Sequence, residues 1–132
     1  KKKQMKEEAE KLLKDLDIKI PDVSVPVGDL SGGQRQGVAV ARLVHRGGKI
    51  LIFDEPTAAM GLNESEAVLR LIRRLASKGY AVILISHNMQ HVFHISDRIC
   101  IMCQGKVVKE LKSKETSMDE VVSFITGSVL SE

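Results

Sequence analysis

Two short stretches of the sequence contain residues that could act on a phosphate group. The first is a loop at the start of a helical pattern, made of Ser31, Gly32, Gly33 and Gln34. The unpaired amides and partial positive charge of a helix N-terminus attract anions, and glycines let an anion approach the backbone. Because serine-capped, glycine-rich loops are also common without any ligand, the loop alone does not define a phosphate site.

The second stretch is an acidic pair, Asp54 and Glu55, directly after the apolar segment 50–53. Open α/β sheets bind ligands at the carboxyl ends of their parallel strands. There, Asp54 could hold Mg²⁺ through water, and Glu55 could orient or deprotonate an attacking water. Two solvated acids at a strand end would give the same pattern, so the pair alone leaves both interpretations open.

A third candidate is His87, which follows the apolar segment 81–85. It could contact a phosphate, although a lone histidine at a strand end more often makes a structural hydrogen bond. Cys100 and Cys103 form a C-x-x-C pair on an expected strand. Residues i and i+3 of a strand face opposite sides, about 10 Å apart, so we expect neither a disulfide nor a metal site there.

The elements that would position these residues follow from hydrophobic periodicity and turn signals. Helical patterns cover residues 4–16, 32–46, 64–78, 88–95 and 117–126. Strand patterns cover 49–53 and 81–86, and a hairpin joins 98–103 to 106–110. Ser31 and Asn63 are the expected caps of the second and third helices. Strand, helix and strand with short connections predict a parallel βαβ unit, and continuous apolar strands predict burial on both faces.

Composition places the 132 residues among globular proteins, with 43% hydrophobic residues and a net charge of +3. No apolar run is long enough to span a bilayer and no signal-peptide pattern opens the chain, so we expect a cytosolic protein, docked on a membrane partner. Lysines near the start alternate with acidic residues. This mixture indicates a solvated helix face, and no nucleic-acid partner is expected.

In their order and spacing, these motifs resemble the nucleotide-binding subunits of ABC transporters. The segment LSGGQRQ (30–36) resembles the signature motif, and ILIFDEPTA (50–58) resembles the Walker B strand with its adjoining glutamate. AAMG (58–61) occupies the D-loop position, His87 matches the switch histidine, and the hairpin resembles the one that commonly follows. The amino-acid sequence of residues 54–93 is most similar to the sequences of the ATPases of monosaccharide importers.

The resemblance implies an α/β fold, namely a partial P-loop NTPase (RecA-like) core with parallel strands. Part of the helical signature subdomain and a C-terminal β-hairpin would complete it. Residues 1–48 would belong to the helical subdomain with the signature motif. Residues 49–132 would form the C-terminal part of the ATPase core, with Walker B, D-loop, switch histidine, hairpin and last helix.

The resemblance also implies roles for the site residues. In a head-to-tail dimer the γ-phosphate of ATP held by the opposite subunit would be contacted by Ser31, Gly32, Gly33 and Gln34. On the chain's own side, Asp54 would help to position Mg²⁺, Glu55 would act on the hydrolytic water, and His87 would contact the γ-phosphate. ATP and Mg²⁺ are then the cofactors, and the partners are a second ATPase subunit and transmembrane permease subunits. The expected location is cytoplasmic, peripheral on the inner face of the cell membrane.

Two departures from the family pattern bear on this interpretation. Gly61 stands where the D-loop usually ends in aspartate, which affects coupling between the two sites of a dimer. The Walker A loop G-x-x-x-x-G-K-[ST] is absent from the 132 residues: Gly32 and Gly37 have the spacing, but Val38 follows. The resemblance therefore covers nearly all of the chain but about the second half of an ATPase domain.

Three functional hypotheses follow. The chain is the C-terminal half of an ABC transporter ATPase, inactive alone, or a non-catalytic module that supplies its signature loop in trans to a partner ATPase. A DNA-repair or chromosome-type ATPase would carry long coiled-coil heptads near the signature, and none appear. Because sheet neighbours are missing, we also expect an unpaired edge and self-association of the isolated chain.

Overall fold

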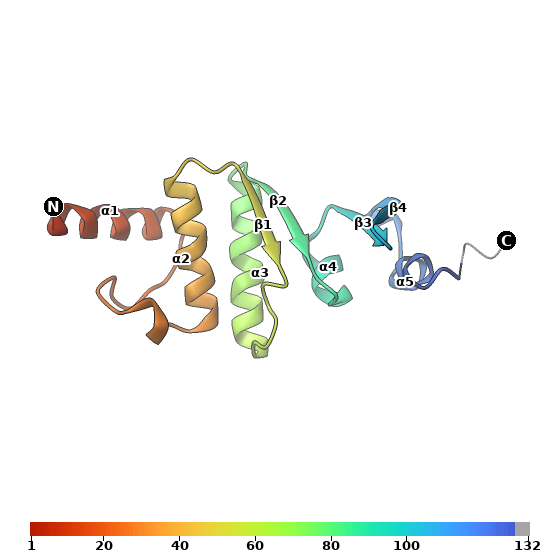
Figure 1. Cartoon of the computed structure of the whole chain (residues 1–132), viewed down its shortest axis with the longest axis horizontal. Helices are drawn as coiled ribbons and strands as arrows, with labels where there is room; N and C mark the ends of the chain where they lie inside the picture. The colour runs from red at the N-terminus through yellow and green to blue at the C-terminus, as the bar shows by residue number, and fades with distance from the viewer. Residues whose placement is uncertain (129–132) are drawn as a thin grey trace. The chain divides into compact units, whose positions relative to one another are not determined.

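The computed structural model describes residues 1–128 and divides the chain into two compact units, Lys1–Ile85 and Ser86–Glu132. The elements of the first unit are α1 (Lys2–Asp15), η1 (Val27–Asp29), α2 (Gly32–His45), β1 (Ile50–Asp54), α3 (Leu62–Ser77) and β2 (Ala81–Ile85) (Figure 1). Those of the second are α4 (Met89–Ile95), β3 (Arg98–Cys103), β4 (Lys106–Lys112), η2 (Ser113–Glu115) and α5 (Met118–Thr126). All the expected helices and strands are therefore present, with boundaries shifted by a few residues.

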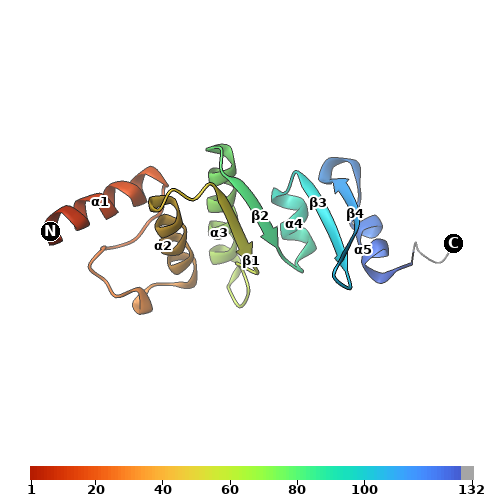
Figure 2. The same ribbon diagram turned by 45° about the horizontal axis from the view of Figure 1, so that its top comes forward.

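The first unit is built on a parallel βαβ arrangement. β1 and β2 pair in parallel, with Ile50 opposite Ala81 and Asp54 opposite Ile85, and α3 connects them. α3 packs on the sheet, α2 packs on α3, and α1 packs on α2, as Figures 1 and 2 show. The predicted α/β fold with parallel strands is thus confirmed.

The buried face of the sheet is apolar and tightly covered. Leu51 and Phe53 point from β1 into the core, where Val68 and Leu75 of α3 are each only 1% exposed. Burying side chains of this size stabilises the unit by about 1.5–3 kcal/mol each. This face of β1 fixes the carboxyl end of the strand, where Asp54 stands.

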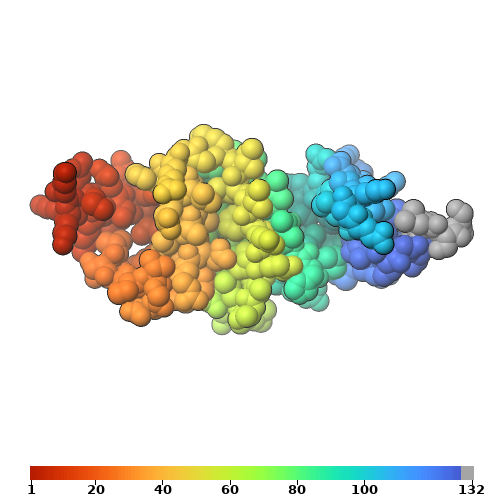
Figure 3. All heavy atoms as spheres, viewed as in Figure 1, coloured from red at the N-terminus to blue at the C-terminus, as the bar shows by residue number. Residues whose placement is uncertain are grey.

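The opposite face of the sheet is open, so the predicted burial on both faces is wrong. Ile50 and Ile52 of β1 are 67% and 61% exposed, and Ile83 and Ile85 of β2 are 50% and 49% exposed. The reason is physical: within residues 1–128, one layer of helices packs on the sheet formed by β1 and β2, and side chains of a strand alternate between its faces. Figure 3 shows the atoms of β1, in yellow, at the surface of the unit.

The open face predicts self-association of the isolated chain, because contiguous exposed apolar residues favour association in water. We expect sedimentation velocity to show a concentration-dependent dimer or higher species. Ile52→Lys combined with Ile83→Lys is expected to shift the protein to the monomer. Leu62→Lys, at a 74% exposed position on α3, is the matched control and should leave the oligomeric state unchanged. A monomer at every concentration would contradict the prediction.

Gly37, whose spacing from Gly32 is not followed by the lysine of a Walker A loop, has a packing role. It is buried in α2, and a Cβ built there would lie 2.6 Å from Cγ2 of Ile18. A glycine inside a helix costs about 0.5–1 kcal/mol relative to alanine. The close approach of Ile18 accounts for a glycine at this position.

The second unit is held by a small apolar core. The antiparallel strands β3 and β4 form the predicted hairpin, and Ile99 and Ile101 of β3 pack with Val121 of α5. Ser117, at the start of the last predicted helix, accepts a hydrogen bond from the amide of Glu120 at 3.2 Å and caps α5. Cys100 and Cys103 lie on β3, the strand on which they were predicted.

Among residues 1–128, no helix combines the length and the apolar character needed to cross a bilayer. The division after residue 85 separates two parts of this chain that are each compact. The boundary predicted at 48/49 concerns the helical and core subdomains of a complete cassette, and it stays a prediction.

Candidate phosphate site

The signature loop (residues 31–34) forms the N-terminal cap of α2. Oγ of Ser31 accepts a hydrogen bond from the amide of Gln34 at 3.2 Å, and the amide of Ser31 donates to Oε1 of Gln34 at 3.0 Å. This reciprocal capping box satisfies two backbone donors of the helix start. The predicted cap is confirmed, and the Ser31 and Gln34 side chains hold each other in place.

The two glycines of the loop lie against the beginning of α3. The amide of Gly33 donates to Oε1 of Glu64 at 3.0 Å. A Cβ at Gly32 would lie 3.1 Å from Cε of Met60 and 3.3 Å from Oε1 of Glu64. The small size of these residues is therefore used by packing within the chain, in addition to any use in approaching a phosphate.

Asp54 and Glu55 stand at the carboxyl end of β1, as predicted. Asp54 is the last residue of the strand and is exposed on the open face. Glu55 is half-buried, its amide donates to the carbonyl of Ile85 at 2.8 Å, and its φ is 48°. A non-glycine residue in this left-handed region costs on the order of 1–3 kcal/mol. The backbone turns sharply at Glu55, and the two carboxylates leave the strand end from consecutive positions.

The D-loop segment follows with two tight turns. The amide of Ala58 donates to the carbonyl of Glu55 at 3.1 Å, and that of Met60 donates to the carbonyl of Thr57 at 3.3 Å. Gly61 has an extended backbone (φ −69°, ψ 169°), and a Cβ there would meet nothing within 4 Å. Neither space nor backbone conformation therefore requires glycine where the family usually has aspartate.

α3 starts differently from its prediction. Gly61 is its N-cap and provides no side-chain hydrogen bond, while Asn63 lies inside the helix. The predicted cap at Asn63 is wrong because the helix begins at Leu62, one residue before it. Glu64 consequently falls in the first turn, where its carboxylate reaches the amide of Gly33.

His87 follows β2 by two residues and belongs to the second unit. It is exposed and lies just before Asn88, whose side chain caps α4 by accepting from the amide of His91 at 3.2 Å. Its part in a phosphate site stays a prediction. The residues that the structure brings together are those of the signature loop with Met60 and Glu64, and Glu55 with Ile85.

The chemistry of Asp54 fits a Mg²⁺ site that is completed by other groups. Within the described part of the chain, no three His, Cys, Asp or Glu side chains come together as a metal-binding group. Magnesium bound to nucleotides commonly uses one or two carboxylates, with phosphate oxygens and waters as the remaining ligands. A single exposed carboxylate at the strand end is compatible with that arrangement.

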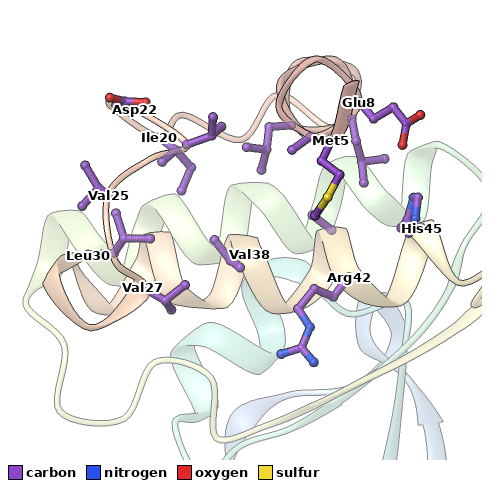
Figure 4. Close-up of a pocket in the computed structure, with 15 residues that line it drawn as sticks. Met5, Glu8, Ile20, Asp22, Val25, Val27, Leu30, Val38, Arg42 and His45 are labelled. Atoms are coloured by element: carbon purple, nitrogen blue, oxygen red, sulfur yellow. The ribbon is translucent and has the colours of Figure 1, made fainter. Parts of the chain in front are cut away.

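A separate cavity of about 320 Å³ lies between α1, the connector before α2, and α2 (Figure 4). Its lining is mainly apolar, with Met5 reaching from α1 toward α2 and Val38 on the opposite wall. At its edge, the backbone amide of Ser24 donates to Asp22 at 2.8 Å and lowers the pKa of that carboxyl. An apolar lining does not suit a triphosphate, so this cavity is distinct from the candidate phosphate site.

Sequence reasoning placed Met60 in the D-loop segment but assigned no site role to Met60 or to Glu64. The one signal for Glu64 is that it is an acidic residue in the first turn of a helix, where its negative charge interacts favourably with the helix dipole. Nothing in the spacing of 31 residues between Gly33 and Glu64 predicts that their atoms meet. That contact depends on the way α2 packs on α3.

Comparison with known proteins agrees with this geometry. The family profile described as "ABC transporter" matches residues 1–58. The xylose/arabinose import ATP-binding protein XylG of Sulfolobus acidocaldarius is 44% identical over 129 residues, which is 98% of this chain and 51% of that protein. The fructose import ATP-binding protein FrcA of Rhizobium meliloti is 48% identical over 109 residues, 83% of this chain and 42% of that protein.

A solved structure shows the same fold. The dimeric post-hydrolysis state of an ATP-binding cassette bound to ADP and phosphate superposes with a TM-score of 0.61 at 27% identity. The match covers 78% of this chain and 44% of that one. The fold is thus that of part of an ATP-binding cassette, and the predicted resemblance to the ATP-binding proteins of ABC transporters is confirmed. The chain is similar to ATP-binding proteins of sugar import, and it spans about half the length of those relatives.

Proposed function

We propose that this chain is the part of a sugar importer's ATPase subunit that carries the Walker B carboxylates and the signature loop. The observation behind this proposal is the acidic pair Asp54 and Glu55 at the carboxyl end of a parallel strand, in the same compact unit as a capped signature helix. The relatives reported above include import ATP-binding proteins for xylose/arabinose and for fructose. Sugar uptake driven by ATP hydrolysis is therefore the function that we propose for the complete subunit.

The proposed roles divide between two nucleotides. Asp54 would hold Mg²⁺ through water, and the ion would neutralise charge on the phosphates. Glu55 would accept a proton from the attacking water, and His87 would contact the γ-phosphate. Ser31, Gly32, Gly33 and Gln34 would face the γ-phosphate of ATP on the opposite subunit of a head-to-tail dimer. Transmembrane permease subunits and the cytoplasmic face of the membrane complete the proposed setting.

The chain alone is expected to be inactive. Its 132 residues contain no G-x-x-x-x-G-K-[ST] loop, so the lysine and backbone cradle for the phosphates must come from another segment. We expect no ATP turnover by the purified chain. Fusion of the first half of the XylG relative ahead of residue 1 is expected to restore Mg²⁺-dependent ATP hydrolysis. A soluble, folded fusion that binds ATP but does not hydrolyse it would count against the proposal.

The alternative is a non-catalytic module that supplies the signature loop in trans. It is supported by the capping of α2, which is complete within this chain. The test adds the chain to a cassette with an intact phosphate loop and a disabled signature loop. Stimulated hydrolysis would favour the module, and no stimulation together with an active fusion would favour the subunit.

A further inference from the structure

The N-termini of α2 and α3 lie side by side, and one carboxylate joins them. Oε1 of Glu64, in the first turn of α3, accepts the hydrogen bond from the amide of Gly33 in the first turn of α2. Figure 1 shows the starts of both helices at the same end of the unit. A negative charge at this place is favourable for both helix dipoles, so Glu64 serves two helix starts at once.

The space around the two glycines differs: it is tight at Gly32 and ordinary at Gly33. A Cβ at Gly33 would lie 3.4 Å from Cγ of Glu64 and 3.6 Å from Cγ2 of Val68, and a Cβ at Gly32 would crowd the Glu64 carboxylate. The first turn of α2 therefore packs directly against the start of α3, most tightly at Gly32. Gly32 and Gly33 are half-buried on this side, whereas Ser31 is exposed.

The side of the loop that faces α3 is thus occupied by Glu64, and the side that carries Ser31 is open to a ligand. We propose that Glu64 is a positioning residue: its carboxylate holds the first turn of α2 against the start of α3 and so fixes the geometry in which the signature loop meets a phosphate. The inference rests on the proposed function for its phosphate. It ties the signature loop to the D-loop segment that ends at Gly61, three residues before Glu64.

Amide hydrogen exchange of Gly33 in this 132-residue chain tests the contact directly. Glu64→Ala is expected to speed exchange at Gly33 by about tenfold, because a hydrogen bond to a charged acceptor is lost. Glu64→Gln keeps an acceptor oxygen of the same reach and should retain most of the protection. The control is Glu66→Ala on the same helix, whose exposed carboxylate pairs with Arg70 at 3.6 Å and should leave Gly33 unchanged. Unchanged exchange in Glu64→Ala would overturn the proposal.

Association with a partner cassette tests the functional consequence. The partner has an intact phosphate loop and a glutamine in place of its catalytic glutamate, so that it holds ATP. Glu64→Ala is expected to weaken ATP-dependent association by about tenfold, with recovery in Glu64→Gln. Glu64→Ala and Glu64→Gln both remove the negative charge. If both tighten ATP-dependent association, the carboxylate of Glu64 repels the phosphate, and the positioning role is overturned. If the unsubstituted chain does not associate, it does not supply its signature loop in trans as an isolated chain; the fusion then tests the proposed function, and the exchange of Gly33 still decides the role of Glu64.

Discussion

Glu55→Gln, in the cassette completed with the first half of the XylG relative, is expected to bind ATP normally and to hydrolyse it about 10²- to 10⁴-fold more slowly. Glutamine keeps the length of the side chain but cannot accept the proton of the attacking water. The backbone at Glu55 lies at φ 48°, a conformation that glutamine tolerates no worse than glutamate, so the turn after β1 should persist. Single-turnover hydrolysis with ATP binding measured separately distinguishes the loss of chemistry from a loss of affinity.

The matched control for this prediction is Glu66→Gln. It makes the same chemical change at an exposed position on α3, where the carboxylate pairs with Arg70. We expect its turnover to equal that of the unsubstituted fusion. If Glu55→Gln also retained full turnover, the proton would be accepted elsewhere, and the assignment of Glu55 as the group that acts on water would be wrong.

Much of the local structure could be predicted because its causes lie within a few residues. Ser31 and Ser117 cap α2 and α5 through hydrogen bonds to amides three residues ahead. Gln104 and Gly105 both have positive φ at the predicted hairpin turn. Gly47, at φ 82°, follows the predicted end of α2. Each of these features depends on hydrogen bonds or backbone conformations of residues close together in the sequence, so it can be predicted from residue types and spacing.

The errors concern causes that lie outside any short window. The pattern 50–53 predicts a strand covered on both faces, because apolar residues occupy both of its sides. The structure covers Leu51 and leaves Ile52 61% exposed, since a second covering layer is not provided by residues 1–128. The apolar residues of a strand show what it can bury, and only its neighbours determine what it does bury.

The residues of the candidate site likewise fall into those that the sequence could place and those that it could not. Asp54 and Glu55 could be placed at a strand end because the strand period and its end are local. The contact of Glu64 with Gly33 could not, because 31 residues separate them and the packing of two helices brings them together. The motif order identified the family, and the three-dimensional structure identified a residue that the motif does not contain.

Leu75→Ala is expected to destabilise the first unit by about 2–5 kcal/mol. Leu75 is only 1% exposed in α3, so alanine leaves a cavity that the surrounding side chains can fill only in part. This is a large fraction of the stability of a domain, which is about 5–15 kcal/mol. Urea unfolding followed by the fluorescence of Tyr80, the chain's single tyrosine, reports on the first unit alone.

The same helix provides the control, because Leu62 is 74% exposed in its first turn. Leu62→Ala makes the same chemical change without a cavity and should alter stability by less than about 0.5 kcal/mol. Both variants replace leucine by alanine in the same helix. The difference between their free energies of unfolding therefore measures the packing of α3 on the sheet and not a change in helix propensity. Equal urea midpoints would show that Leu75 does not lie in a packed core. In that case the sheet would not hold Asp54 and Glu55 in the geometry from which their roles are argued.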